Sequence, residues 1–244
     1  MNLLRAAATV SAATAALLLA ATATPALAGP VSVGLAIVGR CTDDDFPEGL
    51  ADSKQLTARA RTGLIEPVRG WLVDHAVAHA SPAEIDEHGI VGALRVAGLR
   101  ALQQVADRGH APGVIILDGV ADWLTAPQPD LLTVLGDGRP SRAAPEPAVD
   151  IPTPPVRMEV KADARCAVVA AASVLAKVER DSRMVELAQT HPHYGWADNK
   201  GYSASAHLDA LAAHGPSEEH RRSWSLPGVA AVAPQAVQVQ LGLE

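Results

Sequence analysis

Val160 to Arg183 reads V-K-A-D-A-R-C-A-V-V-A-A-A-S-V-L-A-K-V-E-R-D-S-R and says more about the fold than any other part of this chain. It opens with an aspartate and continues as an Ala- and Ser-rich run, which predicts a helix over 165–187 that packs closely on a sheet. A polar loop, H-P-H-Y-G-W-A-D-N-K-G-Y, follows over 191–202, and H-G-P-S-E-E-H-R-R-S-W closes the region over 214–224. The order is therefore an acidic residue, a small-residue helix, a polar loop and a basic-aromatic end.

Two apolar, β-branched runs outside this region predict buried strands. One, over 31–38, is bounded by a proline and a glycine, and the other, over 113–117, ends at an Asp-Gly pair. Strands and helices mixed in this order, without a long alternating βα series, predict a compact α/β domain built on a mixed sheet. The remaining elements expected are a strand over 158–160, helices over 57–76, 89–105 and 207–214, and a helix start at Ser81-Pro82-Ala83-Glu84.

The composition indicates a folded protein but does not identify a ligand. Hydrophobic residues make up 48% of the 244 residues and aromatic ones only 3%, so the core must be built from Ala, Val, Leu and Ile. The formal charge of −7 neither supports nor excludes a nucleic-acid partner, because such a partner needs only a local basic surface. Cys41 and Cys166 lack the spacing of a zinc site or a disulfide framework.

The two ends of the chain and one internal segment stand apart from the predicted domain. Residues 1–28 are typical of a secretory signal, with an early arginine, an apolar run over 6–21 and the A-x-A triplet at 26–28, and 1–25 is set apart as a signal-like or misread segment. The apolar run is too short for a convincing membrane span. Residues 126–156 collect prolines and predict a surface insertion. After Pro227 we expect a flexible tail over 228–244.

Two aspartates are candidates for chemistry. Asp118 ends an apolar strand, a favoured place for a site in an α/β sheet, although a turn aspartate bonded to nearby backbone N–H groups is the alternative. Asp163 precedes the small-residue helix, where an N-cap or first-turn role is equally open. Asp181, in an Arg-Asp pair inside that helix, is interpreted as a structural ion-pair partner.

Five separated segments together resemble ribonuclease HII, the type 2 ribonuclease H, and they occur in that family's order. The resemblance covers about 26–227, interrupted by the proline-rich insertion, and residues 26–34 are similar to the segment after the family's first acidic motif. The segments are Asp52-Ser53-Lys54, Glu84-Ile85-Asp86, the stretch from Asp163 to Lys177, Lys200-Gly201-Tyr202, and His220 to Trp224.

This resemblance implies a ribonuclease H-like mixed five-stranded sheet flanked by helices, with a short helical C-terminal part. It implies endonucleolytic hydrolysis of RNA in RNA–DNA hybrids and at single ribonucleotides in duplex DNA, 5′ to the ribonucleotide. The cofactor implied is Mn²⁺ or Mg²⁺, in a two-metal reaction, and the expected protein is a cytoplasmic monomer without a membrane partner. Asp118 and Asp163 would be the catalytic metal ligands, Tyr202 would read the RNA–DNA junction, and Lys54, Lys200 and Arg221 would contact phosphates.

The chain departs from the family at its first acidic motif. Where Asp-Glu-x-Gly-Arg-Gly is expected, positions 20–25 read A-A-T-A-T-P, so two carboxylates and the Gly-Arg-Gly are missing. Two aspartates are too few to hold two divalent cations firmly, so weak or absent cleavage is expected. Three explanations stay open: a misread coding start, a catalytically dead relative that still binds hybrids, and a secreted non-catalytic protein.

Overall fold

A mixed sheet of five strands forms the centre of the molecule. This computed structural model describes residues 16–21, 26–125, 153–227 and 229, and for 16–21 it describes the backbone alone. The strand order is β3-β2-β1-β4-β5; β1 runs antiparallel to β2 and parallel to β4, and β4 and β5 are parallel. The strands are β1 Ala16–Ala21, β2 Val31–Val38, β3 Asp74–Ala80, β4 Val114–Asp118 and β5 Val156–Glu159.

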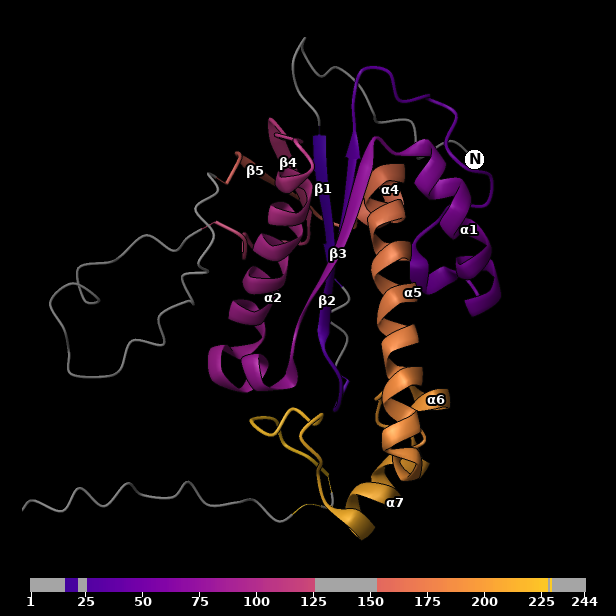
Figure 1. Cartoon of the computed structure of the whole chain (residues 1–244), viewed down its shortest axis with the longest axis vertical. Coiled ribbons are helices and arrows are strands. Elements are labelled where there is room, and N and C mark those ends of the chain that lie inside the picture. Colours follow the sequence, from indigo (N-terminus) through magenta and orange to yellow (C-terminus); the bar gives the residue numbers. More distant parts are fainter. Residues whose placement is uncertain (1–15, 22–25, 126–152, 228, 230–244) are drawn as a thin grey trace, which may run out of the picture.

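Helices cover both faces of this sheet, as Figure 1 shows, so the predicted mixed α/β class is confirmed. Helix α2 packs on β2 and β3, whereas α5 packs on β1 and β2 and is flanked by α1. The short helices α6 and α7 form the C-terminal part beyond the end of α5. The helices are η1 Ser53–Gln55, α1 Ala58–Trp71, α2 Pro82–Asp107, α4 Ala162–Arg165, α5 Ala167–Thr190, η2 Pro192–Tyr194, α6 Trp196–Asn199 and α7 Ser205–His214.

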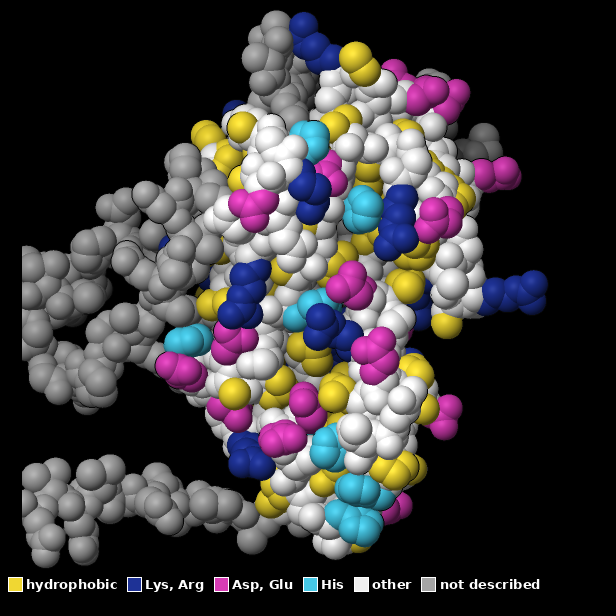
Figure 2. All heavy atoms as spheres, in the orientation of Figure 1, with side chains coloured by type: hydrophobic (Ala, Val, Ile, Leu, Met, Phe, Trp, Pro, Cys, Tyr) yellow, Lys and Arg dark blue, Asp and Glu magenta, His cyan; other side chains and the backbone are white. Residues whose placement is uncertain are grey.

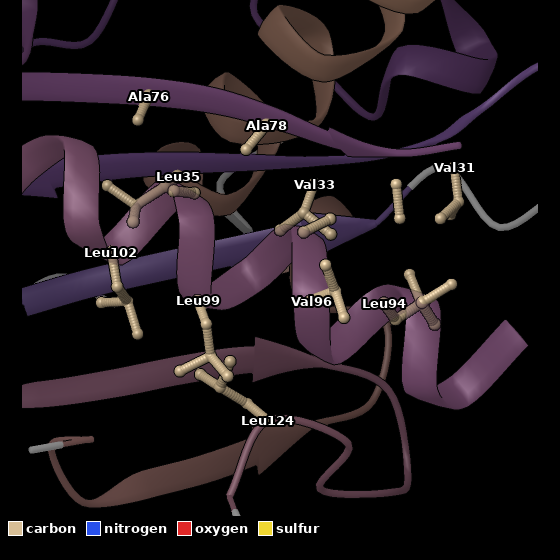
Figure 3. Close-up of a cluster of buried hydrophobic side chains, with 14 of the residues drawn as sticks. Val31, Val33, Leu35, Ala76, Ala78, Leu94, Val96, Leu99, Leu102 and Leu124 are labelled. Carbon is tan, nitrogen blue, oxygen red and sulfur yellow. The ribbon is translucent and has the colours of Figure 1, made fainter. Parts of the chain in front are cut away.

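Alternation along β2 divides the core between the two faces, because successive strand side chains point in opposite directions. The odd-numbered residues, such as Val33 and Leu35, pack with Leu99 and Leu102 of α2, as Figure 3 shows. Ala36 instead belongs to the cluster formed with α1 and α5. Leu, Val, Ile and Ala supply nearly all of both clusters, as the scarcity of aromatic residues requires.

The small residues of α5 allow it to lie directly on the sheet. A Cβ added to Gly34 of β2 would come within 2.1 Å of the Ala172 carbonyl oxygen and 3.0 Å of the Ala176 Cβ. Helix and strand backbones are therefore in contact here, which larger side chains on either element would prevent. The close helix–sheet packing predicted from the Ala-rich run is confirmed.

Strand β1 occupies the central position of the sheet, between β2 and β4. Its register pairs Ala20 with Gly34 of β2 and Leu19 with Leu117 of β4. Position 20, where the family's first carboxylate is expected, therefore lies one residue beyond the Leu19–Leu117 pair, at the level of Asp118. Residues 1–15 and 22–25 of the signal-like segment lie outside the described residues.

Several predicted boundaries were wrong. The helix expected over 57–76 ends at Trp71, and 74–80 forms the edge strand β3, which pairs with β2 along its whole length. The helix start at Ser81 is confirmed by a capping box, and α2 continues through a non-helical Gly89 (φ 72°). The helix expected over 165–187 is α5, which begins two residues later and ends three residues later, and the separate short helix α4 precedes it across Cys166.

The insertion and the tail fall mostly outside what the structure describes. Val156 belongs to strand β5, so the insertion is shorter than 126–156, and its residues 126–152 lie outside the described residues. Of the tail over 228–244, only Val229 is described, and it packs on the cluster around α6 and α7. Within the described part of the chain, no helix is long and apolar enough to cross a membrane.

Candidate active site

Asp118 is the last residue of β4, as predicted, and its half-buried side chain faces the start of α4. Its Oδ1 accepts a hydrogen bond of 2.8 Å from the backbone N–H of Ala162. Burial raises the pKa of Asp118, and the negative charge of Asp163 raises it further, while the hydrogen bonds from α4 oppose both effects. This carboxylate is therefore easier to protonate than an ordinary aspartate.

Asp163 lies in the first turn of α4 and is only 5% exposed. It is not the N-cap, because Lys161 holds that position in a left-handed conformation (φ 56°). Its Oδ2 forms an ion pair of 3.1 Å with the Nζ of Lys54. Three of the six predicted site residues thus meet at one edge of the sheet.

The short helix η1 fixes Lys54 beside this carboxylate. Asp52 caps the helix by accepting from the Lys54 backbone N–H at 2.9 Å. The hydroxyl of buried Ser53 lies 2.7 Å from that of Ser173 on α5, which ties η1 to the main helix. Lys54 itself keeps its side chain 67% exposed, so its ammonium group borders both Asp163 and solvent.

The charges at this edge are strongly coupled. Burial acts to lower the pKa of Lys54, but its hydrogen bond to Asp163 and the nearby charges of Asp52 and Asp118 outweigh burial and raise it. Lys54 is therefore firmly cationic at neutral pH. The cluster contains one positive charge and three carboxylates: Asp118 accepts from the first N–H of α4, Asp163 lies in the first turn of α4, and Asp52 caps η1.

These residues do not fit the two-cation site that the resemblance implies. Two divalent ions about 4 Å apart need several anionic oxygens between them. Among the described residues, no group of three or more His, Cys, Asp or Glu side chains is placed to hold a metal ion. An ammonium group already neutralises Asp163, and an alanine stands at position 20. The site keeps part of the donor set and lacks the rest.

Lys200 and Tyr202 lie in the loop between α6 and α7. The Asn199 side chain braces the loop, donating to the Tyr194 carbonyl and accepting from the Gly201 N–H, both at 2.8 Å. Lys200 is left-handed (φ 53°), and its ammonium group turns back onto the Ala197 carbonyl. The Tyr202 ring is half-buried.

Two cations of α5 lie beside the Tyr202 ring. The Lys177 Nζ is 5.4 Å and the Arg180 Cζ 5.3 Å from the ring centroid, both within cation–π range. Arg180 also donates to the carbonyl of Pro30, which lies just before β2 and four residues from Gly34. Because Gly34 is level with Asp118, Pro30 lies about 13 Å along the sheet from the level of Asp118. The predicted residues therefore form two clusters.

The prediction that Arg221 contacts phosphate conflicts with its position. Its side chain is fully buried (0% exposed), and its guanidinium donates to the Gly29 and Pro30 carbonyls at 3.2 and 3.4 Å. The Cζ also lies 4.7 Å from the Trp224 ring centroid. A buried guanidinium bound to backbone carbonyls cannot reach a phosphate without rearrangement, and the local sequence H-R-R-S-W gave no signal of this burial.

Sequence reasoning missed Arg180 and His207, which support the Tyr202 loop. Arg180 is 1% exposed although it lies in a helix with many charged residues. The His207 Nδ1 donates to the Tyr202 carbonyl at 2.8 Å. The apolar neighbours of Arg180 along one helical face are a signal that could have indicated its burial.

Charge on the surface gives little further guidance. On the face seen in Figure 2, Lys and Arg side chains alternate with Asp and Glu side chains, and no large area carries a single sign. Recognition of a polyanion on this face would depend on individually placed residues rather than on a broad basic field. Asp181, interpreted as structural, is confirmed in ion pairs with Lys177 and Arg61.

Comparison with known proteins identifies the family. Residues 24–226 match the sequence profile of "Ribonuclease HII", a match that begins beyond positions 20 and 21. The chain is 42% identical over 200 residues to ribonuclease HII of Streptomyces avermitilis, covering 82% of this chain and 72% of that one.

Solved structures agree at the level of the fold. Ribonuclease H2 of Pyrococcus horikoshii has a TM-score of 0.61 at 24% identity, covering 87% of this chain and 95% of its own. Bst-RNase HIII in complex with Mn²⁺ has a TM-score of 0.60 at 21% identity, covering 83% of this chain and 63% of its own. From the profile match and the identity to its relatives, this chain is a member of the ribonuclease HII family.

Proposed function

We propose that this chain is a ribonuclease H-type domain that binds RNA–DNA hybrids and duplex DNA containing single ribonucleotides, and that its present sequence cleaves them weakly or not at all. The reaction of a complete site would be hydrolysis 5′ to a ribonucleotide, leaving a 5′-phosphate and a 3′-hydroxyl. The family supports the reaction class, and the composition of the site supports the impairment.

The register of β1 is the observation that carries this proposal. Position 20 pairs with Gly34 and lies level with Asp118, next to it in the sheet. Residues at the same level of neighbouring strands share a face, so a carboxylate at position 20 would join Asp118 at the site edge. This register supports the assignment of the missing ligand to position 20, where the sequence has alanine.

The binding part of the function rests on groups that remain. Lys54 is cationic and largely exposed, which suits a phosphate contact. Tyr202 offers a half-buried ring; stacking on a base is worth about 1–3 kcal/mol, and the 2′-hydroxyl distinguishes RNA from DNA. We assign Lys200 to a further phosphate contact, once its ammonium group leaves the Ala197 carbonyl.

A divalent cation, Mn²⁺ or Mg²⁺, is the cofactor we propose for a chain with the complete carboxylate set. Hard cations of this kind take oxygen ligands, and a relative of the same fold has been solved with Mn²⁺. In that chain, Asp118 and Asp163 would contribute two of the ligands. The proposed substrate is chromosomal nucleic acid, which agrees with a cytoplasmic monomer acting without a membrane.

The test compares this chain with a variant in which the motif is restored. The variant carries Ala20→Asp, Ala21→Glu, Ala23→Gly, Thr24→Arg and Pro25→Gly. With Mg²⁺ or Mn²⁺, it should nick a duplex containing one ribonucleotide at least about 100-fold faster than the unmodified chain. Adding Asp118→Asn to the restored variant should abolish the gain, because it removes one of the proposed ligands.

Binding measured in EDTA separates the remaining possibilities. The unmodified chain should bind the ribonucleotide-containing duplex more tightly than an all-DNA duplex of the same sequence. Rapid cleavage by the unmodified chain would contradict the impairment, and equal or absent binding would contradict the recognition. A native protein that begins at Gly29 would instead favour the secreted alternative, since cleavage after Ala28 is what the signal-like pattern predicts.

A further inference from the structure

Two arginine side chains are buried side by side beneath the Tyr202 loop. Arg180 of α5 is 1% exposed, and Arg221, from the segment after α7, is 0% exposed. Arginine is rarely buried without a carboxylate partner, because removing its charge from water is costly. Their joint burial therefore requires an explanation.

Both guanidinium groups bind the same short segment before β2. Arg221 donates through Nε to the Gly29 carbonyl and through Nη2 to the Pro30 carbonyl, at 3.2 and 3.4 Å. Arg180 donates through Nε to Pro30 and through Nη2 to the Ala28 carbonyl, at 3.2 and 3.3 Å. The Pro30 carbonyl accepts from both arginines, so the two side chains together bind the backbone of Ala28 to Pro30.

Arg180 also links the Ala28 to Pro30 backbone to the Tyr202 loop. Its Nη1 donates to the Lys200 carbonyl at 3.2 Å, and its Cζ lies 5.3 Å from the Tyr202 ring centroid. The Gly201 carbonyl in turn accepts from the backbone N–H groups of Leu27 and Ala28, at 2.8 and 3.3 Å. A Cβ on Gly201 would come within 2.6 Å of the Ala28 carbonyl oxygen, so the Tyr202 loop packs directly against the backbone of Ala28.

The charges of the pair are poorly compensated for a purely structural contact. Arg180 has Asp181 at 3.8 Å, and among the described residues the Arg221 Nη1 has no hydrogen-bond partner. Burial lowers the pKa of Arg221 to about 10, and the neighbouring Arg180 contributes to this shift. Apolar residues would fill the same space without the free-energy cost of burying two charges. The guanidinium groups are therefore explained by the hydrogen bonds with which they hold the backbone in place.

We infer that Arg180 and Arg221 are positioning residues: their hydrogen bonds to the backbone of Ala28 to Pro30 hold the Tyr202 loop in the position where the Tyr202 ring meets the ribonucleotide. This inference rests on the proposed function, since it assigns to the pair the alignment of the proposed junction reader. Arg221 contributes to recognition through this contact and not by touching a phosphate.

The test is a double-mutant cycle read by binding in EDTA. Arg221→Lys keeps the charge but loses the fork; it should reduce the preference for a ribonucleotide-containing over an all-DNA duplex by about tenfold. Tyr202→Ala should reduce the same preference, and the combined variant should lose no more than Tyr202→Ala alone. Arg180→Lys should behave as Arg221→Lys does. Arg183→Lys, on the exposed side of α5, is the matched control and should change nothing.

The outcomes separate this inference from the function it rests on. If the unmodified chain prefers neither duplex, the proposed recognition itself fails. If it does prefer the ribonucleotide-containing duplex, an unchanged preference in both lysine variants overturns the inference. So does a loss that adds fully to that of Tyr202→Ala, because the arginines would then act independently of the ring. Failure of both lysine variants to fold, judged by circular dichroism, overturns it too, since the pair would then serve the fold alone.

Discussion

At the residue scale, Lys54 decides the electrostatics of the candidate site. Its ammonium group borders Asp163 and solvent at once, so a phosphate would compete with a carboxylate for it. The ion pair is worth little as a source of stability, because the lysine is largely exposed. Its importance lies in placing a positive charge beside a partly buried carboxylate pair.

Replacing Lys54 by methionine should remove one phosphate contact. The slope of log affinity against log salt concentration for duplex binding should then become shallower by about one, since one fewer counterion is released. Titration with potassium chloride, followed by fluorescence anisotropy, would measure both slopes. Arg183→Met is the control. An unchanged slope for Lys54→Met would show that Asp163 retains the ammonium group in the complex.

The candidate site also shows how far single residues could be predicted. The positions of Asp118 at a strand end and of Asp163 in a first helical turn were predicted because both are local features of the sequence, while their role as metal ligands stays a prediction. Arg221 was misplaced because its burial depends on Gly29 and Pro30, almost two hundred residues earlier in the chain. No local pattern reports a contact between segments so far apart.

At the element scale, the contact between α5 and β2 depends on one glycine. Gly34→Ala would place a methyl group 2.1 Å from the Ala172 carbonyl oxygen, and backbone atoms cannot rotate away as a side chain does. The free energy of unfolding should fall by about 2–4 kcal/mol. Gly63→Ala in α1, where nothing lies within 4 Å, should instead stabilise by about 0.5–1 kcal/mol. Urea denaturation of both variants tests this, and equal effects would contradict the tight packing.

Element boundaries could be predicted where specific residues mark them, but not where a helical pattern runs directly into a strand pattern. Ser81 with Glu84 gave the start of α2 because a capping box has a fixed spacing. Strand β3 was missed because 74–80 follows α1 after only two residues, and its alanines and histidines fit a helix almost as well as a strand. Pairing with β2 settled the choice, and pairing is a tertiary effect.

At the scale of the whole molecule, two buried histidines should make stability depend on pH. The His207 Nε2 accepts from the Trp196 Nε1 and lies 3.0 Å from the His220 Nε2, and the His220 Nδ1 accepts from the Ser217 N–H. This pattern requires both rings to be neutral. Burial, with the neighbouring His207, lowers the pKa of His220 to about 4, and burial lowers that of His207 as well.

The sign of the effect follows from these shifts. Between pH 6.5 and about 4 the unfolded chain binds a proton at His220 that the folded chain does not, so stability should fall as the pH falls through this window. The loss from His220 should reach at most about 3 kcal/mol near pH 4. Thermal unfolding of the chain and of His220→Gln, from pH 7 to 4, should show a shallower decline in the variant. His88→Gln is the control, and parallel curves for all three would contradict the neutral pair.

The central place of β1 has a consequence for how the chain is made. Of the described strands it is synthesised first, yet its parallel neighbour begins at Val114, the partner of Ala16. At about 5–20 residues per second, the ribosome needs roughly 5–20 s to deliver that partner. During this interval β1 can form a hairpin with β2. The backbone N–H and C=O groups on its other edge, which pair with β4 in the folded sheet, stay unpaired and can bind a strand of another chain. The nascent chain is therefore most prone to strand mispairing before β4 leaves the ribosomal exit tunnel. Chaperones that bind nascent chains would act on it during that interval.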